Sequence, residues 1–380
     1  MTSSERREAR YQRRKASREE KRKRDVDGAL DFDDVVTFMH LYRSAEKCFR
    51  GVSWKASVQA YKCKTGINVA KKFLKLKNGD FRQRKYPEFV IHERGHARRI
   101  NSINIDDRVA HKCVCKYALK PVLHRGLIYD NYASQEGKGT YKARQRNKAM
   151  LEKHIRKYGM EGGVIIFDFR KFFDSIRHDL IRGVLEKNFD DQRITDINMA
   201  IVGTCRKDVG IVLGSENSQD FAIAVPSAFD HYIKEVLHVE GFGRYMDDGL
   251  IIDPDYEHLK MVYRKIKEYA SSIGLTLSEK KCRLLHFGQP FTFLQRKYSF
   301  TKTGGIIIRP SRTSVVRERR KLKRLCRRVN NGTLPAQTGY NSLNAWKASI
   351  KGCRCTKIVR SIEQLYNKLF IYDWLYGQEV

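Results

Sequence analysis

The chain contains 380 residues, of which 41% are hydrophobic, so it is long enough to bury a core in two or three subdomains. Lysine and arginine number 76 against 43 aspartates and glutamates, and the net charge of +33 favours polyanionic partners. The sequence contains no transmembrane run, no secretory signal and no Walker-type phosphate loop. These absences argue against a membrane protein and a P-loop enzyme, and a cytoplasmic location is expected.

Residues 1–30 form a basic arm that contains almost no apolar side chains. Its lysines and arginines run from Arg6 to Arg24. A segment of this composition cannot bury a core, so we expect it to be disordered or weakly helical until it meets RNA or an acidic partner. A solubilising tail would have the same composition.

The segment 31–160 predicts helices separated by an irregular basic stretch. Apolar residues between Phe32 and Tyr42 indicate a first helix, and the residues 109–123 indicate another that begins after an Asp-Asp pair. The sequence Gly-Lys-Gly-Thr at 137–140 is typical of a turn.

A buried strand is predicted just before Asp168. Residues 163–167 are a short apolar segment opened by glycines, and the segment ends at Asp168. Asp174 or Ser175 could then start or cap a helical turn. Alone, Asp168 could equally be a strand-end aspartate that faces water.

A tight β-hairpin with acids at its tip is predicted at Tyr245-Met246-Asp247-Asp248. The motif lies between Gly243-Arg244 and the apolar run 250–252. An Asp-Asp-Gly turn in an ordinary hairpin would have the same pattern. Adjacent carboxylates repel each other, however, and a fold commonly holds them together because a divalent cation lies between them.

These two acidic motifs together point to metal-dependent phosphoryl transfer. Asp168 precedes Asp247 by 79 residues, and a strand end beside a hairpin tip would gather three carboxylates. Three are sufficient for two magnesium ions, because magnesium also keeps waters and substrate phosphates as ligands.

An amphipathic helix with a basic exterior is predicted from 309 to 328. Val315, Leu322, Leu325 and Val329 fall on one face. The opposite faces carry lysines and arginines that we assign to nucleic-acid binding: Arg317, Arg320, Lys321, Lys323 and Arg324. A solvated helix packed on the remainder of the protein is the alternative. Asn-Asn-Gly at 330–332 ends this helix, and residues 338–349 and 356–375 predict two more.

The chain resembles reverse transcriptases of bacteria and phages over roughly residues 80–375. Asp168 matches the aspartate of the family's first palm motif, and Tyr245 to Asp248 matches its signature hairpin. Residues 274–281 resemble the next palm motif, and 291–295 resemble the primer-grip hairpin, in which Gln295 replaces the usual glycine.

The resemblance implies an α+β fold of the right-hand polymerase type. Its expected parts are fingers over 31–160, a palm with an antiparallel sheet over 161–303, and a helical thumb over 305–380. The segment after the palm leaves no room for a maturase, endonuclease or RNase H domain, and the basic helix would be the first helix of the thumb. The turn at 137–140 resembles an element that supports template contacts.

The resemblance also implies two Mg²⁺ ions, for which Mn²⁺ may substitute. The first would be held by Asp168 and Asp247 and would activate the primer 3′-hydroxyl. The second would be held by Asp168 and the backbone carbonyl of Phe169 and would bind the nucleotide triphosphate. Asp248 would support the site from its edge. Lys281 matches a lysine near the departing pyrophosphate and could protonate it.

The incoming nucleotide is expected beside the fingers motif. On the match, Arg98 would contact the triphosphate, and Arg94 would replace the family's first basic residue, which falls on His96. Phe173 matches the aromatic that excludes a ribose 2′-hydroxyl, and Tyr245 would also contact the nucleotide. Solvated surface charge and a core phenylalanine are the alternatives for these residues. Phe293 and Leu294 would contact the primer.

The segment 213–219 indicates a sub-family. Most reverse transcriptases have Gln-Gly followed three residues later by Ser-Pro, whereas here Leu213-Gly214 is followed by Ser-Gln ending at Gln219. This resembles the polymerases of diversity-generating retroelements, which copy RNA with errors at adenines. Leu213 replaces an amide that could bond around the nascent base pair, and losing a polar contact that penalises misfit lowers discrimination. The family's asparagine is replaced by Ile223, so the match is incomplete.

Two other functions agree with the same residues. One is an antiviral-defence or other bacterial reverse transcriptase that makes templated or untemplated DNA, and the other is a non-catalytic basic RNA-binding protein. The expected partners are an RNA template, a DNA or RNA primer, deoxynucleotides and a small accessory protein.

Overall fold

A computed structural model describes residues 31–93, 96–204, 208–301 and 303–372, with scattered positions between 5 and 20. The chain divides into two compact units. The first comprises Met1–Asn147, Ile165–Asp253 and Glu257–Leu284, and the second comprises Lys148–Val164, Pro254–Tyr256 and Leu285–Val380. Helices and antiparallel strands occur in both, so the predicted α+β class is confirmed.

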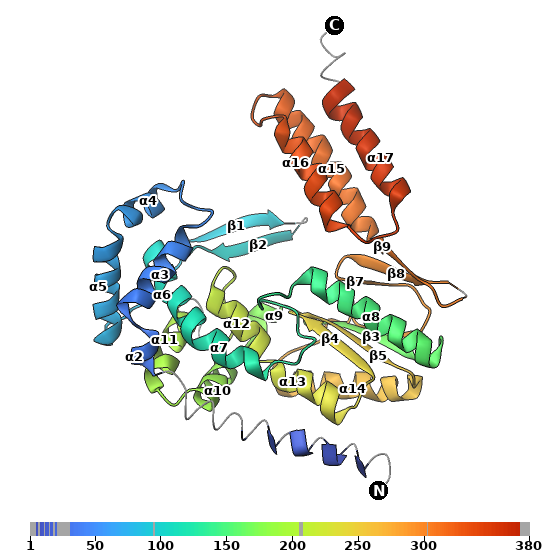
Figure 1. Cartoon of the computed structure of the whole chain (residues 1–380), viewed down its shortest axis with the longest axis horizontal. Helices are drawn as coiled ribbons and strands as arrows, with labels where there is room; N and C mark the ends of the chain where they lie inside the picture. Colours follow the sequence, from blue (N-terminus) through green and yellow to red (C-terminus); the bar gives the residue numbers. More distant parts are fainter. Residues whose placement is uncertain are drawn as a thin grey trace. The chain divides into compact units, whose positions relative to one another are not determined.

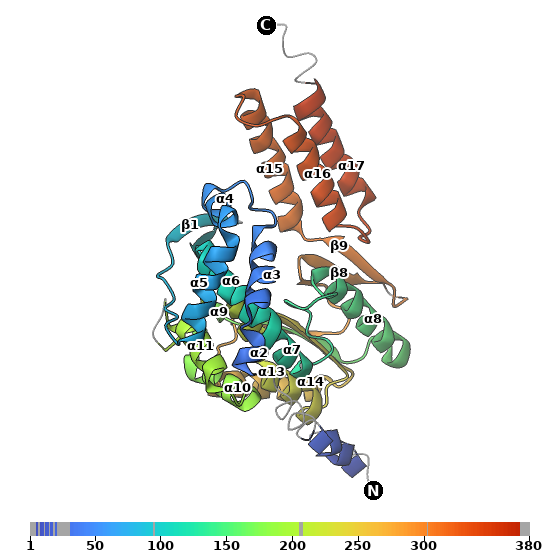
Figure 2. The same cartoon turned by 60° about the vertical axis from the view of Figure 1, so that its left-hand side comes forward.

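The N-terminal part of the first unit is a helical layer that carries a β-hairpin. Its elements are α2 (Phe32–Val35), α3 (Phe38–Phe49), α4 (Ala56–Cys63), α5 (Thr65–Lys77), β1 (Glu88–Glu93), β2 (His96–Asn101), α6 (Ile105–Val114), η1 (Cys115–Leu119), α7 (Lys120–Leu123) and η2 (His124–Gly126). Helix α3 packs against both α5 and α6 (Figure 2). The first predicted helix is divided into α2 and α3, because Thr37 is extended and its side chain accepts the His40 N–H to cap a new helix. The second predicted helix is confirmed, although it begins earlier because the Asn104 side chain accepts the Asp106 N–H at 3.0 Å and caps α6.

The prediction of an irregular stretch after the first helix was wrong, because that part of the chain contains α4, α5 and the β1–β2 hairpin. The periodicity of α5 is obscured because Lys72 occupies a buried position, where its ammonium pairs with Asp106 at 2.8 Å and Asp107 at 3.0 Å. The hairpin lacks alternation because Phe89, Val90 and Ile91 are all exposed.

A four-stranded sheet holds the acidic motifs. Its order is β4 (Gly241–Tyr245), β5 (Asp248–Asp253), β3 (Gly163–Asp168) and β6 (Arg283–His286). As predicted, β3 is buried throughout. Helix α14 (Tyr256–Ser272) buries Leu259, Val262 and Ile266 in the same core as the sheet residues Phe167 and Ile251 (Figure 1).

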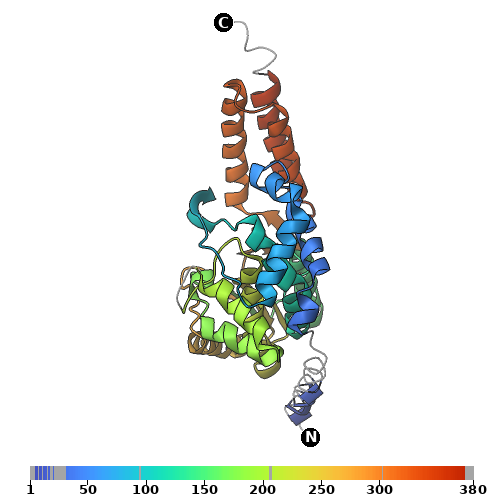
Figure 3. The ribbon, with the colours of Figure 1, turned by 90° about the vertical axis from the view of Figure 1, so that its left-hand side faces the viewer.

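Helix α8 (Thr140–Tyr158) precedes β3 along the chain. The helices between β3 and β4 are α9 (Phe172–Ser175), α10 (His178–Asn188), α11 (Gln192–Gly203), α12 (Glu216–Ala224), α13 (Ser227–His231) and η3 (Tyr232–Val236). Helices α10 and α11 lie side by side (Figure 3). The helical turn expected to start or be capped at Asp174 or Ser175 begins at Phe172 instead, because Lys171 adopts a left-handed conformation before it.

The second unit combines a small sheet with a three-helix bundle. Strands β7 (Phe291–Phe293), β8 (Arg296–Phe300) and β9 (Ile306–Pro310) pair in antiparallel order. The bundle contains α15 (Arg312–Asn330), α16 (Gln337–Ser349) and α17 (Thr356–Asn367), which continues as η4 (Lys368–Tyr372). Leu322, Leu343, Trp346 and Ile362 share its core. The last predicted helix extends to residue 375, but 373–380 lie outside the described residues.

Among the described residues, no helix is both long and apolar enough to cross a membrane.

Candidate active site

The turn between β4 and β5 carries two of the three predicted carboxylates. Tyr245 pairs with Asp248, so Met246 and Asp247 form a two-residue turn, and Met246 has a positive φ of 52°. Gly249 follows at a place where a Cβ atom would lie 2.1 Å from the ring of Phe167. The predicted hairpin is therefore present, and the glycine after its acids allows the sheet to pack closely.

Asp168 ends β3 beside this turn. Its side chain is buried, and the backbone around it is held from two directions. The Phe169 N–H donates to the Asp247 carbonyl at 3.1 Å, and the Ser278 N–H donates to the Asp168 carbonyl at 2.7 Å. These backbone bonds join three segments that the sequence predicted to belong together.

Lys281 supplies a positive charge to these carboxylates. Its Nζ donates to Asp168 Oδ2 at 2.6 Å. Burial lowers the pKa of Lys281, but the hydrogen bond to Asp168 and the charges of Asp168, Asp247 and Asp248 outweigh burial, and the net pKa lies above its usual value. The lysine therefore stays protonated at neutral pH.

The carboxylates also perturb one another. Burial and the charge of Asp168 raise the pKa of Asp247. Burial and the charges of Asp247 and Asp168 raise the pKa of Asp248 to about 7. Asp247 and Asp248 therefore resist ionisation beside a third carboxylate, an arrangement that favours a compensating cation, and Lys281 supplies only one positive charge.

This donor set fits a hard divalent cation. Asp168, Asp247, Asp248 and the Phe169 carbonyl are all oxygen donors. Within the ranges that the structure describes, no group of three or more acidic, histidine or cysteine side chains is arranged so that it could hold a metal ion. Magnesium commonly keeps water and substrate phosphates among its ligands.

The β1–β2 hairpin carries a charge that acts on the same carboxylates. Arg98 lies on β2, paired with Ile91, and its exposed guanidinium lowers the pKa of Asp247, although less than burial raises it. Arg94, the second predicted triphosphate contact, lies outside the described residues.

Phe173 is joined by a backbone hydrogen bond to Ile211, two residues before Leu213. The Phe173 carbonyl accepts the Ile211 N–H at 2.8 Å, and its half-buried ring packs edge-on against Phe172. The structure thus brings the predicted sugar-contacting aromatic and the sub-family motif onto adjacent segments.

Leu213 and Gly214 contact the end of β2. The Asn101 N–H donates to the Leu213 carbonyl at 3.2 Å. Gly214 has a φ of 118°, and a Cβ atom there would lie 2.7 Å from the Asn101 carbonyl oxygen, so only glycine fits. Gln219 is exposed on α12, and its side-chain oxygen accepts a hydrogen bond from Ser134 at 3.1 Å.

The predicted primer grip and basic helix belong to the second unit. Phe293 ends β7, and Leu294 and Gln295 form a two-residue turn with φ values of 45° and 63°. The turn is therefore tight although Gln295 replaces glycine. On α15, Arg317 is half-buried, and the other four predicted contacts are exposed, namely Arg320, Lys321, Lys323 and Arg324.

Sequence reasoning missed a role for two basic residues. Arg244 is completely buried and bonds the catalytic turn, and its only sequence signal was a charged residue inside an apolar strand. Lys138 of the Gly-Lys-Gly turn donates to the carbonyls of Tyr129 and Asn131 at 2.9 Å each. Lys138 therefore organises the loop 129–132.

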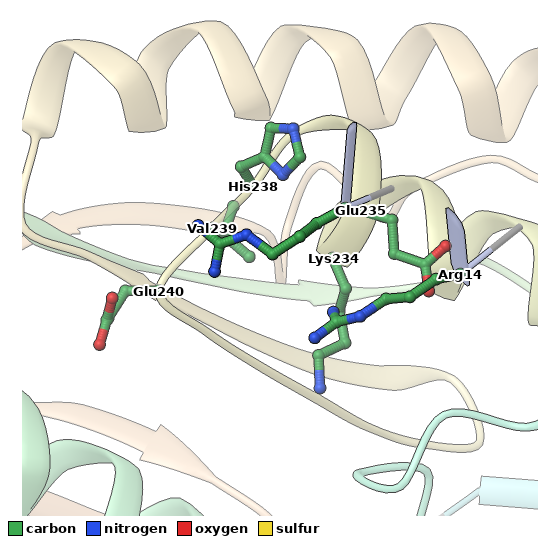
Figure 4. A pocket seen from close by; sticks show the side chains of 7 residues that line it. Arg14, Lys234, Glu235, His238, Val239 and Glu240 are labelled. Atoms are coloured by element: carbon green, nitrogen blue, oxygen red, sulfur yellow. The ribbon is translucent and has the colours of Figure 1, made fainter. Parts of the chain in front are cut away.

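A separate pocket of about 340 Å³ lies elsewhere in the first unit. It is lined by Arg10, Arg14, Lys234, Glu235, His238, Val239 and Glu240 (Figure 4). It contains none of the predicted catalytic residues, so it is distinct from the carboxylate site.

One family of known proteins matches more than half of the chain. The model of the family described as reverse transcriptase (RNA-dependent DNA polymerase) matches residues 85–308. Among solved structures, the chain is similar to telomerase from Candida albicans in complex with the TWJ fragment of telomeric RNA, at 13% identity and a TM-score of 0.47. That match covers 81% of this chain and 65% of the telomerase chain. No curated protein matches the sequence.

Proposed function

Since the chain belongs to the reverse transcriptase family, we propose that it is an RNA-directed DNA polymerase that extends a primer at Asp168, Asp247 and Asp248. The observation that carries this proposal is the gathering of three carboxylates beside the Lys281 ammonium, in which burial and neighbouring carboxylate charge raise the pKa of Asp247 and Asp248. Such an arrangement suits a reaction whose substrate and cations bring large opposite charges to one place.

Asp168 and Asp247 would hold one divalent ion, and Asp168 and the Phe169 carbonyl would hold a second, with Asp248 at the edge. When bound, Mg²⁺ or Mn²⁺ activates the primer hydroxyl and neutralises the triphosphate. Lys281 holds a proton at Nζ that it can donate to the leaving pyrophosphate. Arg98, and Arg94 beside it in sequence, neutralise triphosphate charge.

The residues around the sugar and the base pair set selectivity. Phe173 excludes a ribose 2′-hydroxyl by steric clash. Leu213 offers the nascent base pair no side-chain hydrogen bond, which lowers the penalty for a wrong base. On this basis we assign the enzyme to the error-prone polymerases of diversity-generating retroelements, acting in the cytoplasm with a small accessory protein.

The subdomain assignment follows the same proposal. Fingers occupy 31–160, the palm 161–303 and the thumb 305–380, with Phe293 and Leu294 contacting the primer. The basic face of α15 binds backbone phosphates of the template–primer duplex, which proteins recognise by shape rather than by base edges. The arm 1–30 contributes further charge toward RNA.

Primer extension on a heteropolymeric RNA template, with Mg²⁺ and all four deoxynucleotides, tests the function. The control carries Asp247→Asn with Asp248→Asn. We expect a product that needs both acids and contains errors concentrated opposite adenine. A faithful product would leave a reverse transcriptase of another kind, such as a defence enzyme. No product, even with RNA and accessory protein from the native locus, would support a non-catalytic RNA-binding protein.

A further inference from the structure

A buried guanidinium lies directly behind the catalytic turn. Arg244 is the last residue but one of β4, and its side chain is 0% exposed. It contacts neither Asp168 nor the other two acids through any bond that the structure records, so its role is not direct metal binding.

One edge of this guanidinium is fixed by a bidentate ion pair. Arg244 Nε donates to Asp230 Oδ1 at 2.6 Å, and Nη2 donates to Asp230 Oδ2 at 2.7 Å. Asp230 lies on α13 and is also 0% exposed. Two parallel charge-assisted bonds fix both the position and the plane of the guanidinium.

The other donors reach the turn and a neighbouring helix. Arg244 Nη1 donates to the Met246 carbonyl at 2.7 Å, and Nη2 also donates to the Ile223 carbonyl on α12 at 3.2 Å. Met246 is the turn residue with positive φ, a backbone conformation that costs free energy for any residue other than glycine. A fixed donor on its carbonyl therefore favours the one turn shape that the structure contains.

The backbone of Arg244 is held as well. Its N–H donates to the Asp130 carbonyl, and its carbonyl accepts the Tyr132 N–H, both at 3.0 Å. The backbone and the side chain of Arg244 are therefore both fixed, so its bond to the Met246 carbonyl holds the turn in one position.

We propose that Arg244 is a positioning residue that sets the shape of the Met246–Asp247 turn, and through it the affinity of the carboxylates for divalent cations. The inference rests on the proposed function of the same site. A buried ion pair often stabilises a fold no more than apolar residues of similar volume would. Its use here is the orientation of the turn, which a lysine with a single ammonium cannot reproduce because it lacks the planar fork.

Two variants separate positioning from stability. Arg244→Lys keeps the charge and loses the fork. The double variant Arg244→Met with Asp230→Leu removes both charges, so it leaves no unpaired buried ion. The matched control is Lys72→Met with Asp107→Leu, which removes another buried pair, at 3.0 Å, that does not bond the turn.

The first readout is Mn²⁺ binding, measured from the electron paramagnetic resonance signal of unbound Mn²⁺, beside the melting temperature of each protein. We expect both Arg244 variants to fold and to bind Mn²⁺ at least tenfold more weakly at the Asp247-dependent site, while the control binds as wild type does. In steady-state assays, kcat should fall and the Mg²⁺ concentration for half-maximal rate should rise, with affinity for the template–primer unchanged.

Wild-type Mn²⁺ affinity in either folded Arg244 variant would overturn the inference about Arg244 but leave the proposed catalytic site intact. If the wild-type protein itself showed no Mn²⁺ binding sensitive to Asp247→Asn, the proposed catalytic site would fall, and the inference with it. The two failures are therefore distinguishable in one titration series.

Discussion

Crowding of carboxylates should make the ion-free protein less stable than a variant that lacks one of them. The pKa of Asp248 is about 7 in the folded protein, against an ordinary value of 3.8, because burial and the charges of Asp247 and Asp168 disfavour ionisation. Between these two values the folded state binds a proton that the unfolded state has released. Stability from this group is therefore greatest at low pH and is lost as the pH rises from 4 to 7.

The pKa values bound the size of the effect. A shift of three units corresponds to about 4 kcal/mol, which is an upper limit because the turn is only half-buried and water relaxes part of the repulsion. We expect Asp248→Asn, which keeps the shape and removes the charge, to raise the free energy of unfolding by about 2 kcal/mol at pH 8.

Scanning calorimetry in EDTA, at pH 5 and at pH 8, measures this difference. At pH 8 the variant should melt several degrees above wild type, whereas at pH 5 the gap should be smaller, because wild-type Asp248 then keeps its proton in the folded state. The gap should disappear only below about pH 4, where the unfolded state is protonated as well. Added Mg²⁺ should narrow or reverse the gap at pH 8, since an ion that binds only the folded state stabilises the intact site most. Equal melting at pH 8 in EDTA, or a gap that persists unchanged at pH 5, would refute the reasoning.

Four further substitutions test other parts of the site. Phe173→Ala should raise ribonucleotide incorporation on the order of 10-fold or more, and unchanged sugar selectivity would contradict the steric role. Leu213→Gln should lower misincorporation opposite adenine, so an unaltered error spectrum in sequenced products would count against it. Lys281→Met should reduce kcat about 100-fold; a wild-type single-turnover rate would remove its role in proton donation. Gly249→Ala should cost roughly 2–4 kcal/mol of stability, because its Cβ would meet the Phe167 ring, and an unchanged melting temperature would show that the ring can move.

Local patterns were enough to predict the elements that carry the acids. The strand that ends at Asp168 and the hairpin at Tyr245–Asp248 follow from short apolar runs and from a turn between them, both of which are features of neighbouring residues. The basic amphipathic helix was also recognisable, because its apolar residues recur at helical spacing.

Other features depend on contacts that no local pattern encodes. The turn at Leu294–Gln295 has two left-handed residues without glycine, and it is held by strand pairing and by the Ser311 N–H, which donates to the Gln295 carbonyl at 3.1 Å. Arg244 could not be recognised as buried, because it lies on strand β4 and its partner Asp230 lies on helix α13. The need for glycine at position 214 comes from the Asn101 carbonyl, which is distant in sequence and would clash with a Cβ atom.

The composition of α15 makes ionic strength act on the protein in two opposite directions. Its 19 residues include nine lysines and arginines, whereas its one acid, Glu318, is buried and accepts a hydrogen bond from Ser342 at 3.0 Å. Like charges one turn apart repel each other, so the free helix depends on its packing with α16 and α17, and added salt relieves that repulsion. The same salt removes the gain from counterion release on nucleic acid. Buffers in which the isolated bundle is most stable are therefore those in which its proposed binding to nucleic acid is weakest.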